Sequence, residues 1–208
     1  MKIYEFGNPD ADIVLIQPVD EHDLAGIENE IKTIGENYDK DFFLQAVKVN
    51  DWNRDLSPWK APAVFGREDF GGEAGKTLAE ILELCGDREK TYYIGGYSLA
   101  ALFSLWAVYQ TDVFAGVAAA SPSMWFPDFT DYMKENDIRT DKVYLSLGDR
   151  EEKTRNPVMA TVGDRIREAE IILNERGVKC ILEWNAGNHF KDADIRTAKA
   201  FSSVLNFV

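Results

Sequence analysis

The stretch that decides the fold is Tyr92-Tyr93-Ile94-Gly95-Gly96-Tyr97-Ser98-Leu99-Ala100-Ala101-Leu102-Phe103. Its first half is a short apolar run, rich in aromatic residues, that leads into two glycines. Its second half begins a long apolar segment of helical character. The pattern predicts a strand, a tight turn and a helix, with Ser98 at the turn.

Gly96, Ser98 and Ala100 form a Gly-x-Ser-x-Ala motif. This is the nucleophile-elbow pattern with alanine in place of the last glycine. The turn is so sharp that the residues two before and two after the serine must both be very small. Loose matches to this motif arise often by chance, so the support comes from its position between an expected strand and an expected helix.

Composition predicts one domain over residues 1–208, with a core large enough to need no disulfides. Cys85 and Cys180 lack the spacing of a zinc site, and no metal or cofactor is expected. The net charge of −13 disfavours nucleic acid and membrane surfaces as partners. Neither a signal peptide nor a membrane-spanning stretch is evident, which makes the cytoplasm the expected compartment.

Apolar runs and helical stripes alternate along the chain. Continuous apolar runs predict buried strands at 13–17 (ended by Pro18), 42–49, 91–97, 114–120, 142–148 and 179–184. Stripes at helical spacing predict helices at 24–35, 78–84, after Ser98, from Asn156-Pro157 (with Val158 in its buried stripe) to Gly177, and at the C-terminus with Ile195 inward. We therefore expect a three-layer α/β/α fold with a mostly parallel, doubly wound sheet and no evident cap domain.

Residues 50–72 break this rhythm with a long segment of prolines and glycines that follows a strand. Long loops in such positions commonly serve a site. The candidate substrate-pocket residues are Trp52, Arg54 and Trp59 from this segment, together with Tyr97 and Trp125. Core packing of the tryptophans, and an ion pair of Arg54 with Asp51 or Asp55, are the alternatives.

A serine hydroxyl needs a neighbouring base to act as a nucleophile, and the chain has two histidines, His22 and His189. His189 follows a predicted strand near the C-terminus, where an α/β-hydrolase places its base, so we favour it over His22. The base in turn needs a carboxylate, which in chain order precedes it. The loop after strand 142–148 offers Asp149, Glu151 and Glu152, and spacing does not separate them.

An oxyanion that forms at Ser98 needs two backbone N–H donors. The first is expected from Leu99, the residue after the nucleophile. The second comes from the loop after the first strand, where Pro18 has no N–H and Val19 is therefore the better candidate.

With these residues, the chain resembles the α/β-hydrolases of the esterase group that includes esterase D and the enterochelin esterase-like proteins. The resemblance runs from about residue 40 onward and rests on Gly95–Leu102, Ser121–Trp125, Leu147–Glu151 and Gly187–Phe190. It implies Ser98 as nucleophile and His189 as base, and its pattern of an acid three residues after a glycine ranks Glu151 first, Glu152 second and Asp149 third. Many relatives carry His-Gly where this chain has Gln17-Pro18.

The implied function is a serine carboxylic-ester hydrolase that acts on a small or medium ester through an acyl-enzyme. Some members of the wider group manage with little help from an acid, so a Ser98–His189 dyad is an alternative to the triad. The rival from another class is a non-catalytic α/β-hydrolase scaffold that binds a ligand or partner in its cleft. The natural substrate and the oligomeric state do not follow from the sequence.

Overall fold

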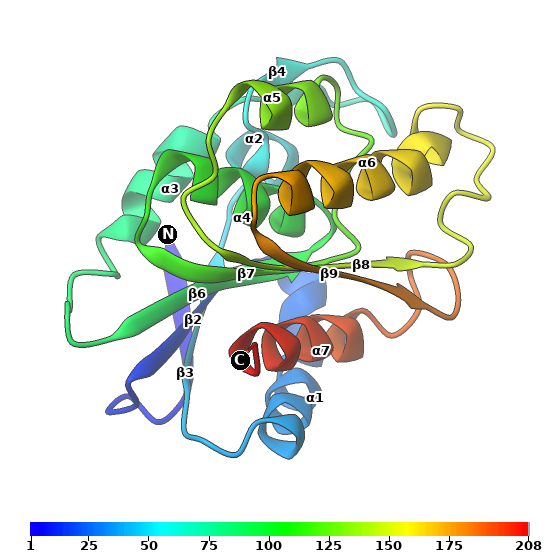
Figure 1. Cartoon of the computed structure of the whole chain (residues 1–208). Coiled ribbons are helices and arrows are strands. Elements are labelled where there is room, and N and C mark those ends of the chain that lie inside the picture. The colour runs from blue at the N-terminus through cyan, green and yellow to red at the C-terminus, as the bar shows by residue number, and fades with distance from the viewer. Residues whose placement is uncertain (208) are drawn as a thin grey trace.

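The apolar runs of the sequence form the centre of a mixed sheet in the computed structural model, which describes residues 1–207 (Figure 1). Within those residues the strand order is β1-β3-β2-β6-β7-β8-β9. The strands are β1 (Lys2–Gly7), β2 (Ile13–Val19), β3 (Phe43–Lys48), β6 (Thr91–Tyr97), β7 (Phe114–Ala120), β8 (Lys142–Gly148) and β9 (Lys179–Asn185). All neighbours pair in parallel except β1, which runs antiparallel to β3 at one edge.

Helices cover both faces of this sheet (Figure 1). On one face lie α1 (Glu21–Asn37) and α7 (Ala193–Leu205), whose inner residues join a core cluster with Leu15, Leu44 and Tyr144 of the sheet. The other face carries α2 (Trp52–Leu56), α3 (Ala74–Leu82), α4 (Ser98–Gln110), α5 (Phe129–Glu135) and α6 (Val162–Glu175) over the larger core cluster. The predicted three-layer, mostly parallel architecture without a large insertion is confirmed.

Helix α4 is buried on every side, as its uniformly apolar sequence predicts. Leu99 to Tyr109 are all buried between β6, β7 and the covering helices. Because α4 begins at Ser98, the buried position of this helix fixes the direction of the turn between β6 and α4.

Several predicted boundaries were wrong. Strand β2 continues through Pro18 to Val19, because its ladder with β6 has already ended at Ile16 and only the ladder with β3 continues. Helix α1 begins three residues before the predicted start, at an Asp20 cap, and passes through Gly35 to Asn37. Strand β1 and helix α5 were not predicted.

The predicted helix from Asn156-Pro157 also begins later. The Asn156 side chain accepts hydrogen bonds from the N–H groups of Val158 and Met159, but this cap opens a 3₁₀ turn, η1 (Met159–Thr161), and α6 starts only at Val162. Two residues assigned to buried stripes are exposed: Val158, which precedes η1, and Ile195 in α7.

Residues 50–72 are more ordered than a plain loop. Helix α2 and a small hairpin of β4 (Lys60–Ala61) and β5 (Phe70–Gly71) occupy this segment. Its backbone is held to the body where the N–H of Ala74 donates to the carbonyl of Ser57 and the hydroxyl of Thr77 donates to that of Asp55. These two hydrogen bonds attach the segment to the first turn of α3.

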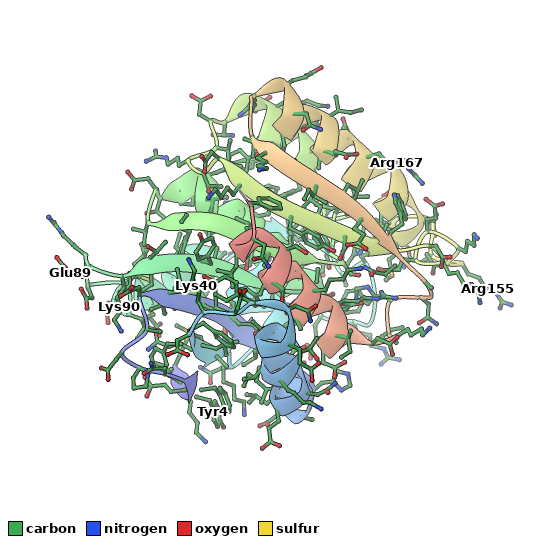
Figure 2. The ribbon with its side chains drawn as sticks, turned by 60° about the horizontal axis from the view of Figure 1, so that its bottom comes forward. Tyr4, Lys40, Glu89, Lys90, Arg155 and Arg167 are labelled. Atoms are coloured by element: carbon green, nitrogen blue, oxygen red, sulfur yellow. The ribbon has the colours of Figure 1, made fainter. Side chains whose placement is uncertain are left out.

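The two ends of the strands lie far apart. In Figure 2, Glu89 and Lys90, which precede β6, project on one side of the molecule, and Arg155, which follows β8, projects on the other. Ser98 and His189 follow the carboxyl ends of β6 and β9, on the side of Arg155. No helix within residues 1–207 is both long enough and apolar enough to cross a bilayer.

Candidate active site

Ser98 lies at the junction of β6 and α4 in a left-handed backbone conformation, with φ at 57°. Residues other than glycine rarely adopt this region, and such strain is typical of functional turns. A Cβ atom on Gly96 would lie 2.9 Å from the Cβ of Ala100, so both positions must stay small. The turn therefore has the steric form that the Gly-x-Ser-x-Ala motif predicts, and it leaves Ser98 only partly buried.

His189 reaches Ser98 from the turn after β9. Its Nε2 atom lies 3.0 Å from the Ser98 hydroxyl oxygen. The Tyr97 hydroxyl donates to the His189 carbonyl at 2.8 Å, which anchors the turn from the residue next to Ser98. The other histidine, His22, is exposed in the first turn of α1 and forms no hydrogen bond with Ser98.

Glu151 completes a hydrogen-bonded chain. Its Oε2 atom lies 2.6 Å from Nδ1 of His189, so a neutral His189 that carries its proton on Nδ1 leaves Nε2 free to accept from Ser98. Its Oε1 atom accepts from the Gly148 N–H at 2.7 Å and from the Ser121 hydroxyl at 2.8 Å. The carboxylate is almost fully buried.

The other two candidate acids face elsewhere. The Asp149 carboxylate accepts from the N–H of Gly187 at 2.8 Å and so supports the turn that carries His189. The Glu152 carboxylate accepts from Arg167 at 3.2 Å on α6. Of the three acids, only Glu151 is within hydrogen-bond distance of the imidazole.

Three polar residues of the site were not predicted from the sequence as functional. Arg196 of α7 is 3% exposed, and its guanidinium donates to Glu151 at 3.1 Å and to the Tyr97 hydroxyl at 3.1 Å. Ser121 has φ at 45° and donates to the same carboxylate, while the Ser123 hydroxyl lies 3.3 Å from that of Ser98. The sequence signal that could have found the two serines was their position directly after β7, the neighbour of β6. For Arg196, a position in the expected C-terminal helix between Ile195 and Thr197 gave no such signal.

The two residues expected to supply oxyanion donors are both buried. Leu99 lies in the first turn of α4, where backbone N–H groups have no partner within the helix. Val19 ends β2, and the next N–H, that of Asp20, already donates to Asp23 at 3.1 Å. Neither Leu99 nor Val19 lines the cavity in front of Ser98.

That cavity has a volume of about 180 Å³ and opens onto Ser98. It is lined by Asp20, His22, Asp23, Trp52, Tyr97, Ser98, His189, Phe190 and Ala193. Two of the candidate pocket residues, Trp52 and Tyr97, are therefore in place. Burial and the charge of Glu151 raise the pKa of Tyr97 to about 12, which keeps its hydroxyl a donor.

The other three candidate pocket residues do not line this cavity. Arg54 forms an ion pair with Asp55 at 2.9 Å. Trp59 donates from Nε1 to the Pro127 carbonyl at 3.2 Å and stacks against Phe129. Trp125 packs edge-on against Phe65 and is buried.

One side of the cavity is acidic. Asp20 caps α1 by accepting from the N–H groups of His22 and Asp23, and the Asp23 carboxylate accepts in return from the Asp20 N–H. Burial, with a smaller contribution from the Asp20 charge, raises the pKa of Asp23 to about 6. No group of three or more His, Cys, Asp or Glu side chains in residues 1–207 has the arrangement of a metal site.

Comparisons with known proteins support the fold. No protein-family model and no curated protein matches the sequence. The structure is similar to an IroE-like serine hydrolase from Shewanella oneidensis, with a TM-score of 0.68 and 13% identity over 93% of this chain and 70% of that one. It is also similar to the siderophore hydrolase EstA from Aspergillus nidulans, with a TM-score of 0.65 and 19% identity over 95% and 84% of the two chains. A Bacillus cereus carboxylesterase aligns with a TM-score of 0.61 and 18% identity over 98% and 93%.

These identities are low, and what the neighbours share with this chain is the arrangement of the sheet and its covering helices over nearly its whole length. Together with the mostly parallel sheet and the sharp turn between β6 and α4, they identify the architecture. The chain has the α/β-hydrolase fold.

Proposed function

We propose that the protein is a serine carboxylic-ester hydrolase in which Ser98 is the nucleophile, His189 the base and Glu151 the acid. The observation that carries this proposal is the continuous hydrogen-bonded chain from the Ser98 hydroxyl through both nitrogens of His189 to Glu151. Structural neighbours described as a serine hydrolase, a siderophore hydrolase and a carboxylesterase agree with it.

The reaction proceeds in two steps. His189 takes the proton of Ser98 as its oxygen attacks the ester carbonyl, and the same imidazolium then protonates the departing alcohol. Water next attacks the acyl-enzyme with His189 again as base, which releases the acid and restores Ser98. Glu151 holds the Nδ1–H tautomer and stabilises the imidazolium, while the Leu99 and Val19 N–H groups are the donors we assign to the oxyanion.

Hydrolysis of p-nitrophenyl acetate tests the proposal. We expect the wild type to hydrolyse it with an initial burst of p-nitrophenol, and Ser98→Ala to lower kcat/KM by at least about 1,000-fold. The matched control is Ser104→Ala, because Ser104 lies one and a half turns further along the same helix and donates only to the Ala100 carbonyl. A wild type without hydrolysis above background would favour the non-catalytic scaffold, and an active Ser98→Ala would show that another residue is the nucleophile.

A further inference from the structure

A second cavity adjoins the one in front of Ser98. Its volume is about 360 Å³, and its wall shares His22, Asp23, Phe190 and Ala193 with the Ser98 cavity. It extends from the nucleophile along the start of α1 and the start of α7. A ligand with its reactive group at Ser98 can therefore continue into this second cavity.

Carboxyl groups dominate the walls of both cavities. Neither wall includes a lysine or an arginine, and the acidic residues that line them are Asp20, Asp23, Glu30, Asp192 and Asp194. Few nearby groups offset this charge: Lys191 lies 3.8 Å from Asp192, and the neutral Asn29 amide donates to Asp194 at 2.7 Å. The carboxylates of Asp20, Asp23, Asp192 and Asp194 therefore make the cavity a region of negative potential next to Ser98.

Glu30 gives an independent indication of a missing partner. It lines the second cavity yet is only 2% exposed, and its Oε2 atom accepts from the Gln17 amide at 3.3 Å. Its Oε1 atom has no hydrogen-bond partner within residues 1–207. Burial without a charge partner raises the pKa of Glu30 well above its usual value, and a positively charged hydrogen-bond donor at the free oxygen would favour the ionised carboxylate.

Aromatic residues stand at the junction with the Ser98 cavity. Phe190 lines both cavities and is 87% exposed, although large apolar side chains are usually covered. Trp52 lines the Ser98 cavity. The face of an aromatic ring attracts organic cations, ammonium groups among them.

We propose that the second cavity binds the ammonium group of a cationic ester whose carbonyl lies at Ser98. This inference rests on the proposed function and specifies its substrate class. The carboxyl groups and the aromatic rings both suit an organic ammonium, whereas the side chains of residues 1–207 form no metal-binding cluster. The net charge of −13 further favours the approach of a cation over that of an anion.

A pair of isosteric esters tests the proposal. One is the p-nitrophenyl ester of hexanoic acid with a primary ammonium group at its far end, which can donate hydrogen bonds, and the other carries a methyl group in the same place. The two differ in charge but hardly in shape. We expect wild-type kcat/KM to be at least about tenfold higher for the cationic ester, and this preference to shrink as ionic strength rises.

Two variants and one control locate the effect. Asp194→Asn and Glu30→Gln keep the shape of residues that line the second cavity, and each is expected to lower kcat/KM for the cationic ester by about three- to tenfold while the neutral ester changes by less than about twofold. Asp112→Asn makes the same change in net charge at an exposed residue before β7, at the amino ends of the strands. It is expected to leave the preference for the cationic ester unchanged.

Calorimetric binding of hexylammonium, a primary ammonium, separates this proposal from the proposed function. Binding by both wild type and Ser98→Ala, weakened in Asp194→Asn, supports the cation site even if neither ester is hydrolysed. Hydrolysis of both esters at equal rates, or no binding of the cation, overturns the cation site while the esterase proposal stands. Circular dichroism melts of each variant establish that a loss is not due to unfolding.

Discussion

At the scale of single residues, Glu151 joins the imidazole to the interior of the protein. One of its oxygens faces His189, and the other accepts from the Gly148 N–H, the Ser121 hydroxyl and the Arg196 guanidinium. Arg196 is itself 3% exposed, so the two charges compensate each other in a site with little water. The three donors on this second oxygen hold Glu151 in place independently of its contact with His189.

Glu151→Gln is expected to reduce kcat on p-nitrophenyl acetate by about 10²- to 10⁴-fold, because an amide at this position favours the wrong imidazole tautomer. It also leaves the buried Arg196 without its charge partner, which is expected to lower the free energy of unfolding by about 3 kcal/mol. Stopped-flow kinetics and urea unfolding measure the two effects separately.

The neighbouring acids are the controls for this prediction. Glu152→Gln removes a partner of Arg167 that makes no contact with His189, and it is expected to leave kcat within about twofold. Asp149→Asn retains an oxygen for the Gly187 N–H and is expected to behave likewise. A loss of activity in Glu152→Gln that matched the loss in Glu151→Gln would contradict the assignment of the acid.

How far the sequence predicts the site depends on how local each contact is. Ser98 sits in a short motif whose steric demands can be stated from Gly96 and Ala100 alone. The choice among three nearby acids depends on which side chain turns toward β9, which no spacing rule determines. Arg196 reaches Glu151 across 45 positions of the chain, and its burial runs against the usual preference of arginine for the surface.

At the scale of elements, strands that are buried on both faces were the easiest to predict. The bounds of β7 and β8 match the predicted ranges because both are nearly continuous apolar runs. Strand β1 alternates between exposed and half-buried residues at the sheet edge, and α5 has only seven residues, so neither has enough apolar periodicity to be recognised. Pro18 was wrongly taken as the end of the strand. A proline has no N–H to donate to a ladder, but the ladder between β2 and β6 ends at Ile16, so the strand tolerates Pro18.

The start of α1 makes stability depend on pH. The pKa of Asp23 is about 6 in the folded protein and about 4 in an unfolded chain, so the folded state binds this proton more tightly. The free energy of unfolding therefore contains a contribution that is fully present below about pH 4 and is lost as the pH rises through about 6. Asp23→Asn removes this dependence and is expected to be more stable than wild type at pH 7 by about 2 to 3 kcal/mol.

Urea unfolding of both proteins at several pH values measures this difference. The comparison isolates Asp23, because all other carboxyl groups titrate in both proteins. An asparagine oxygen can still accept from the Asp20 N–H, so the helix cap is retained. A difference between the two proteins that stayed constant from about pH 4 to about pH 7 would show that Asp23 has an ordinary pKa in the folded state.

At the scale of the whole molecule, the doubly wound topology brings the site together. The strands β6, β8 and β9 lie in one half of the sheet, with β7 between β6 and β8. Their parallel direction places Ser98, Glu151 and His189 at one edge, although 91 positions separate the first from the last. Two helices far apart in the sequence, α1 and α7, lie together on one face and bring Asp23 and Asp194 to the walls of one cavity (Figure 1).

The same molecule carries a net charge of −13, and this excess is expected to oppose folding. Exposed ion pairs such as Arg165 with Glu168 at 2.8 Å contribute little to stability, so their screening by salt changes the stability little. Repulsion among the unpaired carboxylates is also screened by salt, and it is the larger effect because negative charges outnumber positive ones. The melting temperature is therefore expected to rise by about 2 to 4 °C between about 10 mM and about 200 mM NaCl.

Differential scanning calorimetry measures this shift, with sucrose at matched osmolality as the control for non-ionic effects on the solvent. The Asp112→Asn and Asp194→Asn variants refine the test, because each removes one negative charge. Asp194 lies among other carboxyl groups whereas Asp112 lies at the other end of the sheet, so the salt dependence is expected to fall more in Asp194→Asn. A melting temperature that decreased with salt would mean that specific ion pairs outweigh the overall repulsion, and the negative potential assigned to the second cavity would then have to be weaker than its carboxyl groups suggest.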